Sequence, residues 1–275
     1  MIILNPLYTI KARPICLLAS LFIFFSSCQT TKIFTPALYH TDIAYLPKPT
    51  SVDSNHLQTY ISGGLGSISG YNNIDLITVY QAEVSQGWIF KNFNLAYGGF
   101  ANAGNVTNTP NTPDSVNRKD PYFFDQKGFS ALGARVSMNF YQNSGRWTYR
   151  ILGFEAAYSH EFGDYALYRQ SILNAPNYST TAQTNLLTLG ASSEILLEGR
   201  FHPYNKFGFR FFAGQTIGNY NFVLENGAKY FSASRIAPYI NYAFFVQLRN
   251  YFLVADYNSL IYDLSSIRIK IGYHF

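Results

Sequence analysis

The sequence predicts an all-β fold, a transmembrane antiparallel β-barrel of about ten strands, within a range of about eight to twelve. Three observations support it. Apolar and polar residues alternate from residue 57 onward, no long segment has helical spacing, and no apolar run approaches about 18 residues. A membrane protein without membrane helices needs a closed barrel, because every backbone polar group must find a partner within lipid.

Composition agrees with a surface that is only partly in water. The 275-residue chain has 18% aromatic residues and only 13% charged residues. Typical globular domains are roughly 25% charged. The net charge of +5 is spread thinly, without a basic run, so we expect no nucleic-acid partner.

The N-terminus has the order of an export signal. Basic residues precede an apolar run that ends at Phe25, and the small pair Ser26–Ser27 leads to Cys28. These small residues before the cysteine resemble the lipobox of bacterial lipoproteins, in which the cysteine becomes the first mature residue and carries acyl chains. We therefore expect residues 1–27 to be a lipoprotein signal peptide and Cys28 to be lipidated. Cleavage by an ordinary signal peptidase nearby is the alternative.

Residues 28–56 contain three prolines and no sustained period, which predicts an extended tether between the acyl anchor and the first strand. Once the signal is removed, Cys28 is the only thiol of the mature chain. This excludes intramolecular disulfides and a thiolate metal cluster. We expect neither a metal nor another cofactor.

Residues 57–275 form the predicted barrel. The expected strands are 57–67, 73–88, 91–103, 127–141, 146–162, 183–200, 206–224, 230–248, 250–258 and 265–275.

The links between these strands alternate in length. Long links at 104–126 and 163–182 contrast with tight ones such as "QNSGR" and "RN". Outer-membrane barrels show this asymmetry, with short periplasmic turns and longer outside loops, whereas a soluble β-sandwich has no reason for it.

Alternation along the strands assigns the two faces. In strand 127–141, Leu132, Val136 and Phe140 share one side, while Arg135 lies on the other. A charge on the lipid face costs roughly 2–4 kcal/mol near mid-bilayer, so charged residues are expected to face the lumen. The predicted lumen-facing charges are Glu83, Arg135, Glu155, Glu194, Glu198, Arg200, Arg210, Asp256, Arg268 and Lys270.

Both signs are equally represented in this set, and a ten-strand barrel is narrow. Lumenal ion pairs that fill the barrel are the expected arrangement. A selective pore is the alternative that uses the same residues.

The C-terminal stretch "IRIKIGYHF" places apolar and cationic residues on opposite faces of a strand. Ile269, Ile271, Tyr273 and Phe275 resemble the C-terminal signal that the barrel-assembly machinery of bacterial outer membranes reads. Together with the lipobox, this makes the chain similar to small outer-membrane β-barrel lipoproteins of the Bacteroidota type. The resemblance implies an architecture and assigns no activity.

A catalytic site is not expected. Among the five histidines only His160 lies near an outside link, beside Glu161 and Asp164. Neighbouring strand residues point to opposite faces, which disfavours a metal site there. The sequence contains neither a Gly-rich phosphate loop nor a G-x-S-x-G elbow. We therefore predict a protein that is not an enzyme.

The expected function is a structural or surface-interaction role in the bacterial outer membrane, exerted through long extracellular loops. Aromatic residues of the hairpin around "ENGAK", with Tyr220 and Phe222 on one side and Tyr230 and Phe231 on the other, could take part. The expected partners are membrane lipid, the assembly machinery, and an extracellular protein or glycan. Two alternatives are a narrow pore for small solutes and a soluble lipoprotein β-barrel or sandwich that binds a small apolar ligand.

Overall fold

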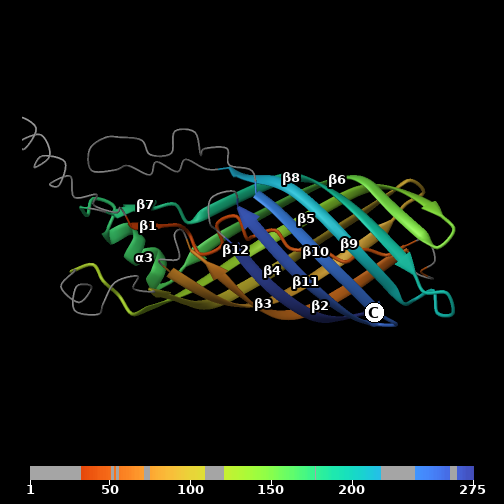
Figure 1. The fold of residues 1–275 in the computed structure, drawn as a ribbon, viewed down its shortest axis with the longest axis horizontal. Coiled ribbons are helices and arrows are strands. Elements are labelled where there is room, and N and C mark those ends of the chain that lie inside the picture. The colour runs from red at the N-terminus through yellow and green to blue at the C-terminus, as the bar shows by residue number, and fades with distance from the viewer. Residues whose placement is uncertain are drawn as a thin grey trace, which may run out of the picture. The chain divides into compact units, whose positions relative to one another are not determined.

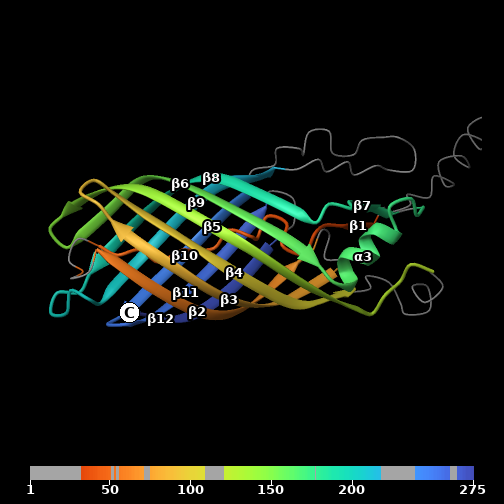
Figure 2. The same cartoon turned by 180° about the vertical axis from the view of Figure 1, so that it is seen from behind.

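Ten strands form the closed wall of an antiparallel barrel in the computed structural model (Figures 1 and 2). The structure describes residues 32–50, 53, 56–70, 75–108, 121–176, 178–217, 239–260 and 265–275. The wall strands are β2 (Leu57–Ser69), β3 (Asp75–Ile89), β4 (Phe93–Asn108), β5 (Gln126–Ser144), β6 (Trp147–Phe162), β8 (Asn185–Glu198), β9 (Lys206–Ile217), β10 (Tyr239–Leu248), β11 (Tyr251–Leu260) and β12 (Ser265–His274). The predicted fold class and strand number are confirmed.

The first and last wall strands close the barrel. β12 pairs antiparallel with β2, in a register that sets Ile269 opposite Leu65 and His274 opposite Tyr60. Each wall strand therefore has a neighbour on both sides, and no wall strand leaves an open edge.

The outer surface is apolar, as lipid requires. On β12, Ile267, Ile269 and Ile271 are exposed, whereas Arg268 and Lys270 between them are buried inside. The same alternation runs through the other wall strands. A soluble barrel would need a polar outer surface, so the apolar exterior removes the soluble alternative. Within the described residues, no helix has the length and hydrophobicity to cross a bilayer.

The two ends of the barrel differ. Links 90–92, 145–146, 199–205 and 249–250 lie at the same end as the C-terminus. Gly145 adopts a φ of 61° in one of them, a conformation that glycine adopts at little cost. The opposite end carries the link between β6 and β8, which contains α3 (Asp164–Ser171) and β7 (Tyr178–Thr180).

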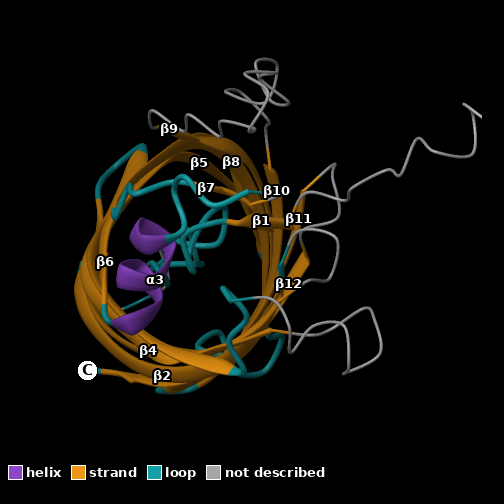
Figure 3. Ribbon diagram, turned by 90° about the vertical axis from the view of Figure 1, so that its left-hand side faces the viewer, coloured by secondary structure: helices purple, strands orange, loops and turns teal. Residues whose placement is uncertain are grey.

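A small structure, here called the cap, lies over this second end (Figure 3). It comprises β1 (Lys32–Phe34), α3 and β7, and β1 pairs in parallel with β7. Phe34 packs against the rings of Phe124, Tyr168 and Tyr178 at centroid distances of 5.7 to 6.0 Å. Aromatic residues of β1, of the β6–β8 link and of the link before β5 thus form a core for the cap.

The segment between the cap and the wall enters the barrel. Residues 35–50, here called the plug segment, are buried throughout, with Tyr39 partly so. The sequence predicted an extended tether over residues 28–56 but gave no indication that its described part would lie inside the lumen.

The described parts of one hairpin lie within the predicted strands. β9 is described to Ile217 and β10 from Tyr239, inside the predicted ranges 206–224 and 230–248. Residues 218–238, including the four aromatic residues of the "ENGAK" hairpin, lie outside the described residues.

Candidate functional site

The lumen gathers the charged residues of the wall. All of the predicted lumen charges except Arg200 are buried inside the barrel: Glu83, Arg135, Glu155, Glu194, Glu198, Arg210, Asp256, Arg268 and Lys270. Strand alternation puts them there, since each lies between outward-facing neighbours.

Arg200 is a correction. The predicted strand continued to residue 200, but β8 ends at Glu198 and Arg200 lies in the following turn. Its side chain is exposed, with the guanidinium 5.8 Å from the ring centroid of Phe201. Alternation no longer fixes the direction of a side chain once the strand has ended.

Charges of opposite sign pair inside the lumen, between strands that are separated by one other strand. Arg210 binds Glu155 through two hydrogen bonds, of 2.9 and 2.7 Å, in a fork-like arrangement. Arg135 forms an ion pair with Glu83, and Lys270 lies 3.6 Å from the other carboxylate oxygen of Glu83. Removing one partner of such a buried pair would leave a charge without compensation.

Cationic side chains of the wall also bind the backbone of the plug segment. Arg268 donates to the carbonyl oxygens of Thr41, at 2.5 Å, and Ile43. Lys270 donates to the carbonyl of Tyr45 at 2.7 Å. An irregular buried segment needs such donors, because its carbonyl groups have no sheet partners.

Two glycines make room for these cations. Gly66 lies opposite Arg268 and Gly64 opposite Lys270 in the β2–β12 register. A methyl group on Gly66 would lie 2.3 Å from Cγ of Arg268, and one on Gly64 would lie 2.8 Å from Cγ of Lys270. The closing strand pair is therefore shaped to let both long side chains reach the plug segment.

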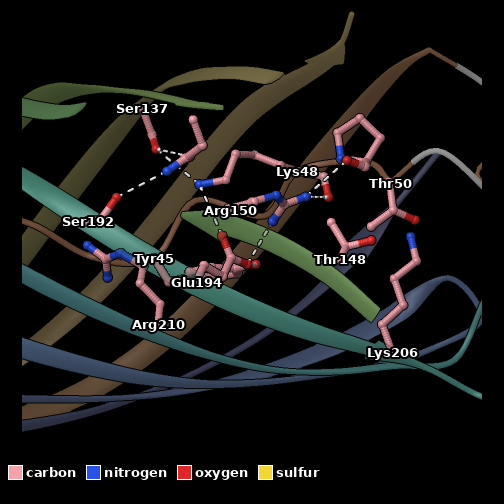
Figure 4. A network of polar contacts seen from close by, with 12 residues as sticks. Tyr45, Lys48, Thr50, Ser137, Thr148, Arg150, Ser192, Glu194, Lys206 and Arg210 are labelled. Atoms are coloured by element: carbon pink, nitrogen blue, oxygen red, sulfur yellow. Dashed lines mark hydrogen bonds and ion pairs between the residues drawn. The ribbon is translucent and has the colours of Figure 1, made fainter. Parts of the chain in front are cut away.

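The densest cluster surrounds Glu194 (Figure 4). Its carboxylate accepts hydrogen bonds from Arg150, at 2.7 Å, and from the hydroxyl of Tyr45, and Lys48 lies 3.7 Å away. Arg150 also donates to the carbonyl oxygens of Lys48, at 3.2 Å, and Pro49, at 3.0 Å. One carboxylate and one guanidinium of the wall thus hold the plug segment at three residues.

Arg150 is the functional residue that strict alternation missed. Side chains alternate along a strand, so residues 155, 153 and 151 should face the lumen and residue 150 should face the lipid. The β6–β8 register shifts between Arg150 and Gly153, and both Ile151 and Leu152 are exposed. The bulge turns Arg150 into the lumen. The adjacent apolar pair Ile151–Leu152 was the available signal.

The end of the lumen near the short turns is partly apolar. Tyr45 of the plug segment lies in a buried cluster with Phe245 and with Phe252 and Val254 of β11. This explains why the first half of β11 is apolar on both faces: its inward residues Phe252 and Val254 meet the plug segment. Beyond this cluster, Lys206 forms an ion pair with Asp53.

The cap is attached to the plug segment by buried polar contacts. Glu161 accepts hydrogen bonds from Arg169 of α3, at 2.8 Å, and from the backbone N–H of Ala37, at 2.6 Å. Tyr165 donates to the carbonyl of Thr35 at 2.9 Å. Burial, and secondarily the nearby Asp75, holds the pKa of Tyr165 well above its usual range.

These contacts separate the three residues His160, Glu161 and Asp164. His160 is exposed and pairs with the side chain of Asn185 at 2.8 Å, while Glu161 points inward to Arg169. Asp164 lies in the first turn of α3. Among the residues that the structure describes, no group of three potential metal ligands is found.

The predicted assembly signal lies on the outer face. Ile269, Ile271 and Phe275 are exposed, and the ring of Tyr273 contacts those of Tyr251 and Phe275 at 5.2 and 5.0 Å. Trp88 and Trp147 are also exposed, and they lie at the short-turn end of the barrel, as in the aromatic belts of membrane proteins. Cys28 lies outside the described residues.

A closed antiparallel barrel with an apolar outside, a charged inside and unequal ends is a transmembrane β-barrel of the bacterial outer-membrane type. No protein-family model and no curated protein matches the chain.

Solved structures with a similar outline include the translocator domain of the autotransporter NalP from Neisseria meningitidis (7% identity, 82% of this chain and 90% of that one, TM-score 0.40). Another is an outer-membrane channel from Pseudomonas putida F1, with 8% identity, coverage of 84% of this chain and 97% of that one, and a TM-score of 0.40. A third is the outer-membrane protein OprG from Pseudomonas aeruginosa, with 10% identity, coverage of 80% of this chain and 96% of that one, and a TM-score of 0.33. Likeness at this level carries no argument about function.

Proposed function

We propose that the chain is an outer-membrane β-barrel lipoprotein without enzymatic activity, which presents its cap outside the cell in a structural or surface-interaction role. One observation carries this proposal: the lumen is occupied by the chain's own plug segment, which binds Arg150, Arg268 and Lys270 of the wall. A filled lumen leaves the ends of the barrel as the places where the protein can act.

The lipidation of Cys28 and the removal of residues 1–27 rest on the sequence alone. The lipobox-like stretch before Cys28 supports them. The exposed apolar side chains at Ile269, Ile271 and Phe275 support recognition of the last strand by the barrel-assembly machinery, since that face is open before the barrel inserts.

The cap offers a surface for an extracellular protein or glycan. Leu167 of α3 is 63% exposed, and Leu173, just after the helix, is 38% exposed. Tyr165 and Tyr168, on the other side of α3, are buried in the cap core. Aromatic packing therefore fixes the helix, while its apolar outer residues remain available for a partner.

Two measurements test this function. The first is gel mobility with and without boiling for the Cys28→Ala chain in outer-membrane fractions. A closed barrel is expected to migrate faster before boiling. A single mobility, with the variant released as soluble protein, would contradict the membrane barrel.

The second measurement introduces a photo-crosslinking amino acid at Leu167 in intact cells, with Leu253 on the lipid-facing side as the matched control position. A surface-interaction role predicts a defined adduct at 167 and none at 253. If Leu167 and Leu173 both give no adduct and the purified chain binds no glycan, only the structural role remains.

A further inference from the structure

The direction of the plug segment is fixed by its contacts. At the cap end, Ala37 binds Glu161, the penultimate residue of β6. Asp42 then meets Thr188 of β8 at 2.7 Å. Asp53, just after the plug segment, meets Lys206, the first residue of β9, at the end with the short turns. The chain therefore runs from the cap, through the lumen, to the short-turn end, where β2 begins.

The start of this path lies within the cap. Lys32 pairs with Tyr178 of β7, and its ammonium group is 5.5 Å from the centroid of the Tyr178 ring. β7 belongs to the long link between β6 and β8. In outer-membrane barrels the long links face the outside of the cell and the short turns face the periplasm.

Only four peptide units join Cys28 to Lys32. Fully extended, they reach at most about 14 Å. The hydrocarbon core of a bilayer is about 30 Å thick. The connection between them is therefore too short to cross the membrane.

We propose that the barrel carries the chain that precedes β2 through its lumen to the cell surface, so that the acyl chains on Cys28 insert into the outer leaflet of the outer membrane. The lipid part rests on the proposed lipidation of Cys28, whereas the path of the chain does not. The partner of the anchor is then the lipid of the external leaflet. The plug segment is the connection between an external anchor and a wall that starts in the periplasm.

Thiol labelling in intact cells tests the path. In the Thr31→Cys variant the new thiol lies next to Lys32, and a membrane-impermeant maleimide should label it without permeabilisation. The matched control is His202→Cys, an exposed position in the short turn after β8. It should be labelled only after the outer membrane is permeabilised. The fast unboiled band on gels confirms that both variants fold.

The outcomes separate the path from the lipid. If Thr31→Cys is labelled only after permeabilisation, or if His202→Cys is labelled in intact cells, the proposed path is overturned. A lipidated Cys28 has no free thiol, so the unsubstituted chain should take up no label. If it is labelled in intact cells, the path holds and the lipidation is overturned.

Discussion

The hydroxyl of Tyr45 donates a hydrogen bond to Oε1 of Glu194, although the two residues lie 149 positions apart in the sequence. Tyr45 belongs to the plug segment and Glu194 to β8 of the wall. The contact lies in the same cluster as Arg150 and Lys48 and is completely buried. It shows how a segment without regular structure becomes part of the barrel interior.

Glu194→Gln should destabilise the barrel strongly. The substitution leaves the buried cations Arg150 and Lys48 without their anion, which should lower the free energy of unfolding by about 3–5 kcal/mol. Tyr45→Phe removes one hydrogen bond and should cost about 0.5–1.5 kcal/mol. Urea titration of the fast unboiled band measures both. Tyr149→Phe, on the outer face, is the control, and an effect equal to that of Glu194→Gln would contradict this assignment.

The path of the plug segment predicts a specific cross-link. Thr188 contacts both carboxylate oxygens of Asp42, at 2.7 and 2.9 Å, so cysteines at these positions should oxidise to a disulfide. The background is Cys28→Ala, which leaves no other thiol in the mature chain. Leu187 points outward, so Asp42→Cys combined with Leu187→Cys should form no disulfide. Gel mobility of the oxidised chains distinguishes the two pairs. Equal cross-linking of both pairs would place the segment elsewhere.

Releasing the plug segment should open the barrel. Arg268→Met together with Lys270→Met removes three hydrogen bonds to plug carbonyls. In planar bilayers we expect discrete conductance steps from this variant and none from the unsubstituted chain. Ile269→Met with Ile271→Met changes the lipid-facing side of the same strand and serves as the control. Conductance of the unsubstituted chain would favour the narrow-pore alternative.

The last residue should matter for assembly in cells more than for stability. Phe275→Ala is expected to reduce the amount of barrel in the outer membrane, because the exposed aromatic terminus is the proposed recognition element. Refolding of the purified variant into lipid vesicles should be unchanged. Ile267→Ala, on the same face of β12 but outside the signal, is the control. Loss of both assembly and refolding would indicate a stability effect instead.

The cap should depend on Arg169. This residue is buried and binds Glu161 at 2.8 Å and the carbonyl of Thr181 at 2.5 Å. Arg169→Met should expose the link 163–184 to chymotrypsin added to intact cells, while the boiled and unboiled bands of the wall still differ. Arg200→Met, in an exposed turn, should behave like the unsubstituted chain. Wall unfolding in the Arg169 variant would mean that the cap and wall are one cooperative unit.

Much of the wall could be predicted because its information is local. Strand alternation, link lengths and the unfavourable energy of a charge in lipid are properties of short sequence stretches. They sufficed for the fold class, the strand number and the inward direction of residues such as Glu83 and Arg210. They failed where alternation itself ends or shifts, at Arg200 beyond β8 and at Arg150 before the β6 bulge.

The plug segment could not be predicted from such patterns. Residues 35–50 have no period, because their side chains meet the wall on all sides. Their stabilising contacts are made largely by backbone carbonyls, which are present in every sequence. The wall donors were visible in the sequence, but their acceptors could be recognised only once the barrel had formed.

The pairing of β2 with β12 gives the molecule a lasso topology. The hydrogen-bonded ring closes only when the last strand meets the first, and the chain that passes through the ring directly precedes that first strand. A bulky group at the threaded end, such as the proposed lipid on Cys28, would not pass through the lumen afterwards. With such a group in place, folding must set the thread before the ring closes, and mechanical extraction of the thread must open a seam of the wall.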